Sequence, residues 1–170
     1  MEKMKTALSH CEICPRGCGI NRTAGKAGWC HAPLLPKVAL VSGHLWEEPP
    51  ISGTKGSGTI FFSHCNLGCV FCQNHTISQE GFGQEVSILR LAEIFLDLQR
   101  QKANNINLVT AGHFLVQVRE ALILAKKQGL TIPVVYNSSG YEKAEMLQLL
   151  DGLVDIYLPD FKYMESDLAG

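Results

Sequence analysis

The chain has 170 residues and a mass of 18.7 kDa, which suits one domain with a sizeable core. Hydrophobic residues make up 46% of the sequence and charged residues 18%, so the composition excludes an intrinsically disordered chain. The net charge is −1 and no stretch is densely basic, which argues against a nucleic-acid partner. The polar first ten residues are unlike a signal peptide, and no stretch approaches the roughly 20 apolar residues of a membrane span. We therefore expect a cytoplasmic protein with no membrane partner.

Composition divides the chain near residue 58. Residues 1–31 hold four of the seven cysteines, and residues 32–58 are rich in proline and glycine. The latter stretch predicts an irregular connection with one short strand over 38–41. We therefore separate a Cys/Gly/Pro-rich N-terminal segment, residues 1–58, from a second unit, residues 59–170.

Residues 59–170 alternate between strand and helix patterns. Apolar, β-branched runs predict strands over 59–62, 106–110, 132–136 and 154–158. The helical stripes between them predict a helix capped by Ser87, a helix over 118–125 closed by Gly129, and a helix over 141–150. This order predicts an α/β fold: a partial (β/α) barrel with parallel strands and about four βα units.

The sequence ends at Gly170, shortly after the fourth of these strands. Four βα units do not close an eight-stranded barrel. We therefore interpret the chain as a C-terminally truncated version of a longer protein, with an assembled or naturally short form as the alternative. We expect the strand over 154–158 to lie at an exposed edge.

Three cysteines follow the first predicted strand in the sequence CNLGCVFC. Cys65, Cys69 and Cys72 have C-x3-C-x2-C spacing. Three thiolates can hold three irons of a [4Fe–4S] cluster and leave the fourth iron open to a small molecule. A zinc ion completed by His64 or His75 is one alternative, and cysteines that only pack in the core are another.

This motif resembles the signature of the radical S-adenosylmethionine (SAM) superfamily, C-x3-C-x-aromatic-C on the loop after the first barrel strand. Residues 52–78 resemble the pyruvate formate-lyase-activating-enzyme-like subgroup in particular. The resemblance implies that Cys65, Cys69 and Cys72 hold a [4Fe–4S] cluster and that SAM binds its open iron. It implies an oxidoreductase that reductively cleaves SAM to a 5′-deoxyadenosyl radical for hydrogen abstraction, with activation of a glycyl-radical enzyme as the finer hypothesis. The implied partners are a one-electron reductant such as flavodoxin or ferredoxin and a glycyl-radical protein substrate.

The same resemblance implies several cofactor-binding residues. Phe71 occupies the aromatic position near the adenine, although it could equally be a core aromatic. Small and polar residues follow each later strand, where ligands bind in parallel βα sheets. The superfamily often has Gly-Gly-Glu after the second strand, whereas this chain has Thr-Ala-Gly-His and no carboxylate there. The residues carried over at these strand ends are His113, Asn137, Ser139, Asp160 and Lys162.

Two of these assignments have structural alternatives. His113 could cap the following helix instead of contacting a ligand. Asp160 and Lys162 could form an ordinary exposed ion pair, which contributes little to stability.

The N-terminal cysteines form a second set. Four cysteines could fill a structural zinc site or a second cluster, with His10 or His31 as substitute ligands, or they could remain free thiols. These four are Cys11, Cys14, Cys18 and Cys30. The competing interpretations of the whole protein are a non-catalytic iron–sulfur or zinc-binding protein and an inactive truncated fragment.

Overall fold

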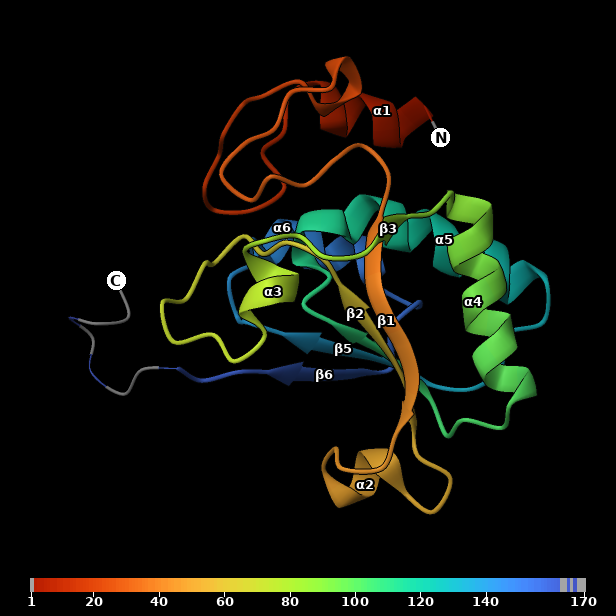
Figure 1. The fold of residues 1–170 in the computed structure, drawn as a ribbon. Helices are drawn as coiled ribbons and strands as arrows, with labels where there is room; N and C mark the ends of the chain where they lie inside the picture. Colours follow the sequence, from red (N-terminus) through yellow and green to blue (C-terminus); the bar gives the residue numbers. More distant parts are fainter. Residues whose placement is uncertain (1, 163–164, 166, 168–170) are drawn as a thin grey trace.

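The computed structural model of the protein describes residues 2–162, 165 and 167. Within these residues, six strands form one sheet in the order β3-β1-β2-β4-β5-β6 (Figure 1). Strands β2, β4, β5 and β6 run parallel, which confirms the predicted α/β class and its mostly parallel sheet. The strands are β1 (Lys37–His44), β2 (Ser57–Phe62), β3 (Gln84–Glu85), β4 (Ile106–Val109), β5 (Val134–Ser138) and β6 (Ile156–Pro159).

One edge of the sheet is antiparallel, which the sequence did not predict. Strand β1 is longer than the strand expected over 38–41, and it pairs antiparallel with both β2 and β3. The chain reverses between β1 and β2 through the short helix α2 (Pro49–Ser52), which has proline in its first turn and Gly53 at a φ of 52° after it. The N-terminal segment 1–58 therefore contributes a strand to the same sheet.

Two long helices cover one face of the sheet. Helix α4 (Ile88–Arg100) begins where predicted, since the Ser87 hydroxyl accepts a hydrogen bond from the Arg90 N–H. Helix α5 (Leu115–Lys127) follows the 3₁₀ turn η2 (Gly112–Phe114), and Gly129 follows its end at a φ of 99°. The two helices contact each other and bury their apolar stripes against the strands (Figure 1).

The third expected helix is short. Helix α6 (Ala144–Leu147) continues only as the 3₁₀ turn η3 (Gln148–Leu150). The reason lies at Glu142, whose carboxylate accepts hydrogen bonds from the hydroxyls of Ser138 and Tyr136. Because this side chain turns back toward β5, the residues around it do not join the predicted helix.

The part of the N-terminal segment before β1, residues 2–36, packs beyond one end of the sheet (Figure 1). It contains α1 (Glu2–Ser9) and the 3₁₀ turn η1 (Arg22–Ala24). Arg22 is buried, and its guanidinium donates hydrogen bonds to the carbonyl oxygens of Pro33 and His113. Leu8 and Ile13 join the main core, so the segment is attached by apolar contact as well as by Arg22. No helix in the described residues is long and apolar enough to cross a membrane.

Candidate metal and cofactor site

The three cysteines of the CNLGCVFC motif lie on the loop between β2 and the short helix α3 (His75–Ser78). Cys65, Cys69 and Cys72 are half-buried and line one cavity of about 90 Å³ at the carboxyl ends of the parallel strands. Gly68 has a φ of 75°, a conformation that allows the loop to turn between the first two cysteines. The structure therefore brings together the three thiols that the sequence predicted as cluster ligands.

Two hydrogen-bond donors face the sulfur atoms. The Leu67 N–H donates to the Cys65 Sγ over 3.4 Å, and the Ser78 hydroxyl donates to the Cys72 Sγ over 3.3 Å. Burial raises the pKa of the Cys65 thiol, the backbone N–H groups beside it oppose that rise, and the neighbouring thiols add to it. Iron would deprotonate such thiols on binding, and the same donors would then stabilise the thiolates.

A cation lies beside the same thiols. Lys162 and Asp160 form an ion pair with 2.7 Å between Nζ and Oδ2, and both line the cavity. Burial opposes the charge of Lys162, but Asp160 and then the sulfur atoms of Cys69 and Cys65 raise its pKa above the ordinary value. The ammonium group therefore stays protonated next to the three thiols.

The carboxyl ends of β4 and β5 supply further cavity residues. The Ser139 hydroxyl lines the cavity of the cysteines, and it is buried without a hydrogen-bond partner. Thr110 also lines this cavity and has a φ of 54°, which is a strained conformation for a β-branched residue. An unsatisfied hydroxyl and a strained backbone at one cavity are features of a ligand-binding site.

A larger, more open cavity of about 720 Å³ adjoins the cysteines on the face of the sheet opposite α4 and α5. Phe71 and Asn137 line it, together with Asp160 and Lys162. The Phe71 ring is 63% exposed, so it is an accessible apolar surface and not a core aromatic. The structure thus groups five of the six predicted cofactor-binding residues around two adjoining cavities.

His113 lies elsewhere. Its ring is buried against Phe114, and its Nε2 lies 2.8 Å from the Ser63 carbonyl oxygen. Burial lowers the pKa of His113 to about 3, so the ring is neutral. It lines neither of the two cavities beside the cluster loop.

His64 was predicted only as an alternative zinc ligand, and Arg16 was not predicted as a site residue. His64 lines the cavity of the cysteines at a φ of 71°, and its Nδ1 is buried without a partner. Arg16 reaches the cysteine loop from the N-terminal segment. Positive φ at a histidine leaves no trace in sequence, whereas the position of Arg16 between two cysteines was a usable signal.

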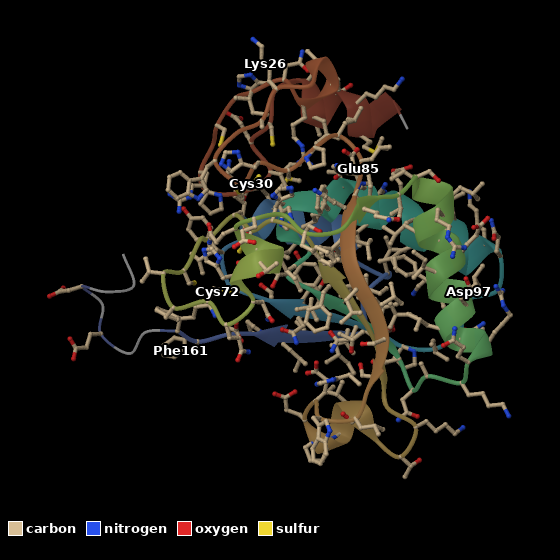
Figure 2. The ribbon with its side chains drawn as sticks, in the orientation of Figure 1. Lys26, Cys30, Cys72, Glu85, Asp97 and Phe161 are labelled. Atoms are coloured by element: carbon tan, nitrogen blue, oxygen red, sulfur yellow. The ribbon has the colours of Figure 1, made fainter. Side chains whose placement is uncertain are left out.

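The N-terminal cysteines line a separate cavity of about 20 Å³. Figure 2 shows Cys30 in this segment and Cys72 on the loop below it. Burial raises the pKa of the Cys30 thiol, and Cys14 and Cys11 add to the rise. Nowhere in the described part of the chain do three or more Cys, His, Asp or Glu side chains already surround one point as ligands of a single ion would. Metal binding by this set therefore stays a prediction.

The cysteine loop suits a cluster better than a single ion. In a [4Fe–4S] cluster each thiolate binds a different iron, so three thiols need only line a shared cavity. In a zinc site all ligands must converge on one atom at about 2.3 Å. The three half-buried thiols around one cavity, with N–H and O–H donors to sulfur, fit the first requirement.

Comparison with known proteins agrees with this geometry. The family model for the radical SAM superfamily matches residues 59–167, which include the cysteine loop and every strand from β4 to β6. The chain therefore belongs to the radical SAM superfamily. Members of this superfamily generally use a [4Fe–4S] cluster, SAM and a reductant.

A relative of the chain is an uncharacterized protein of Methanocaldococcus jannaschii. The two sequences are 34% identical over 180 residues, which cover 98% of this chain and 49% of the relative. The chain thus spans about half the length of the curated relative that it matches. The relative's name states no activity, so neither the subgroup nor the substrate follows from it.

Proposed function

We propose that the protein reductively cleaves SAM at a [4Fe–4S] cluster held by Cys65, Cys69 and Cys72. The observation that carries the proposal is the shared cavity of these three thiols at the carboxyl end of β2, inside the segment that matches the radical SAM superfamily. When both cofactors are bound, they supply one-electron cleavage of the sulfonium C–S bond and a 5′-deoxyadenosyl radical that abstracts hydrogen.

The protein's own residues bind and orient these cofactors. The thiolates of Cys65, Cys69 and Cys72 would bind three irons, and the Leu67 N–H and the Ser78 hydroxyl donate to two of these sulfurs. The Lys162 ammonium adds positive charge beside the thiolates. Such contacts favour the reduced, more negative state of a cluster.

Three residues are proposed to hold SAM. The unpartnered Ser139 hydroxyl would form a hydrogen bond with a ribose hydroxyl or donate one to a carboxylate oxygen. The Asn137 amide lines the larger cavity and can both donate and accept. The exposed Phe71 ring offers a face for the adenine base. Because Asp160 pairs with Lys162, it would fix the ammonium in place.

The finer hypothesis is activation of a glycyl-radical enzyme. It is supported by the resemblance of residues 52–78 to the pyruvate formate-lyase-activating-enzyme-like subgroup and by the open cavity of about 720 Å³, which could admit a peptide backbone. Its partners would be a glycyl-radical protein and flavodoxin or ferredoxin as the electron donor. The free thiols of all seven cysteines suit a reducing compartment, so we propose the cytoplasm.

The test is anaerobic reconstitution with iron and sulfide. The dithionite-reduced protein should give a [4Fe–4S]⁺ electron paramagnetic resonance (EPR) signal that changes when SAM is added, and 5′-deoxyadenosine should form. Replacing Cys65, Cys69 or Cys72 with alanine should abolish both. The control is Lys26→Ala, which removes an exposed side chain of the N-terminal segment outside both cysteine sets. An EPR signal that SAM leaves unchanged in the parent would favour a non-catalytic iron–sulfur protein.

We also propose that Cys11, Cys14, Cys18 and Cys30 hold a second metal, as zinc or as a second cluster. The support is their common cavity. The variant lacking Cys65, Cys69 and Cys72 should then retain zinc or iron in metal analysis. Four freely titrating thiols and no bound metal in that variant would contradict the proposal.

A further inference from the structure

Arg16, in the cysteine-rich N-terminal segment, hydrogen-bonds to the cluster loop. Its Nε donates to the Asn66 carbonyl oxygen over 3.2 Å, and its Nη2 donates to the Leu67 carbonyl oxygen over 3.0 Å. These partners are 50 and 51 residues away in the sequence, between the first two cysteines of the cluster loop. A fork of two parallel N–H groups fixes orientation better than a single contact does.

Aromatic rings hold the guanidinium in this position. The Arg16 Cζ lies 4.0 Å from the centre of the Trp29 ring and 5.6 Å from the centre of the Tyr141 ring. The Asn66 side-chain amide, in turn, donates to the Tyr141 carbonyl oxygen over 2.8 Å. The N-terminal segment, the cluster loop and the loop after β5 therefore meet at Arg16.

A tight turn presents Arg16 to the cluster loop. The Gly17 N–H donates to the Cys14 carbonyl oxygen over 3.1 Å, with Pro15 and Arg16 between them. Gly17 has a φ of 51°, which allows the chain to turn again toward Cys18. Both residues of the Arg16–Trp29 contact lie near N-terminal cysteines. Arg16 lies between Cys14 and Cys18, and Trp29 directly precedes Cys30.

One peptide group links Arg16 to a cluster ligand. The Asn66 carbonyl and the Leu67 N–H belong to the same trans peptide unit, so they point in opposite directions. The carbonyl accepts from Arg16, and the N–H donates to the Cys65 Sγ. A hydrogen bond to the oxygen of an amide strengthens the donor character of its N–H.

We propose that Arg16 is a positioning residue that orients and polarises the 66–67 peptide toward the Cys65 sulfur and thereby raises the reduction potential of the cluster. This inference rests on the proposed function, because it requires a cluster at Cys65. The physical reason is that an added electron makes the cluster more negative. A polarised N–H at the sulfur, backed by a cation, stabilises that state.

The experiment compares the potentials of three variants in the full chain, without SAM. Arg16→Ala removes both the charge and the fork, Arg16→Lys keeps the charge, and Lys26→Ala removes another exposed cation of the same segment. Figure 2 shows Lys26 at the far edge of that segment. The readouts are the midpoint potential and the EPR line shape of the reconstituted cluster.

We expect Arg16→Ala to make the cluster about tenfold harder to reduce, which is a shift of about 59 mV to more negative potential for a one-electron couple. Arg16→Lys should shift it less, and Lys26→Ala should leave it unchanged. A merely structural role would lower the cluster content without moving the potential. If Arg16→Ala fails to fold, Arg16→Lys carries the comparison. Parental potential and line shape in the folded Arg16 variants would overturn the inference.

A second measurement separates this inference from the proposed function. If the parent takes up no cluster, the proposed function fails, but the contact of Arg16 with the cluster loop can still be examined in the metal-free chain. Hydrogen exchange at residues 65–72 should then be faster in Arg16→Ala than in the parent, with α4 and α5 unchanged. Equal exchange in this loop would show that Arg16 does not position it.

Discussion

The two faces of the sheet differ in what they contribute. Toward α4 and α5, side chains such as Ile60, Leu108 and Tyr136 are fully buried. On the opposite face, Val109 and Asn137 line the open cavity beside the cysteines. Because successive residues of a strand point to opposite faces, each strand supplies both surfaces. The comparison teaches that substitutions one position apart should separate stability from cofactor binding.

The largest expected effect is on the helix-covered face. Leu108→Ala should lower the free energy of unfolding by about 2–5 kcal/mol, because it leaves a cavity in a fully buried site. Val109→Ala, one residue along β4, should cost clearly less, since Val109 lines the open cavity. Urea denaturation of both variants measures the difference. Equal losses would contradict the division between the two faces.

A smaller effect concerns His113, which belongs to the covered side. Its ring donates from Nε2 to the Ser63 carbonyl, which can only accept. Burial lowers its pKa to about 3, against about 6.5 in an unfolded chain, so the unfolded chain binds more protons between these values. The free energy of unfolding should therefore fall as the pH drops below about 6.5, by up to about 1.4 kcal/mol per pH unit.

The variant that tests this titration is His113→Gln. Glutamine keeps an N–H donor and stays neutral, so the variant should lose this part of the pH dependence. Denaturation at about pH 7 and about pH 5 compares the two proteins. The same slope in both would assign the acid sensitivity to other groups.

On the open face, Asn137→Ala should affect the ligand and not the fold. We expect the affinity for SAM to fall about tenfold, which is about 1.4 kcal/mol, with stability within about 0.5 kcal/mol of the parent. Titration of the reconstituted protein with SAM measures it. Folded Leu108→Ala protein is the matched control and should keep the parental affinity. A lower free energy of unfolding with an unchanged affinity for SAM would mean that Asn137 has a structural role and does not bind the ligand.

The smallest effect is expected at Ser139. Its buried hydroxyl has no partner, so Ser139→Ala should leave the unfolding free energy of the ligand-free chain unchanged or raise it slightly. Affinity for SAM should fall by about 0.5–1.5 kcal/mol, the value of one hydrogen bond. Calorimetry with and without SAM gives both numbers. Destabilisation of the ligand-free protein would mean that the hydroxyl already has a partner.

Local rules predicted the regular parts of the fold. Ser87 caps α4 as its side chain and position require, and Gly129 follows α5 in the conformation that glycine favours. The position of the cysteine loop at a strand end could be predicted, because the strand before it was recognisable from its apolar run. These features depend on neighbours in sequence, so the sequence reveals them.

Features that depend on distant partners were missed. Strand β1 joins the sheet through its pairing with β2 and β3. Its own residues carry no pattern that predicts an antiparallel edge. Glu142 shortens the third helix through bonds to side chains of β5. Arg16 donates to carbonyl oxygens 50 and 51 residues away. Its position between two cysteines marks it as a candidate site residue, but nothing in the local sequence identifies these partners.

The two edges of the sheet leave different strands open for pairing. Strand β3 offers two exposed residues beside β1, and a strand so short gives an incoming chain almost no backbone to pair with. Strand β6, by contrast, is paired with β5 alone among the described strands, and its second edge is free over Ile156–Pro159. A further parallel strand would therefore extend the sheet beside β6, whereas a strand added at the antiparallel edge would have to pair with β1 beyond the two residues that β3 covers.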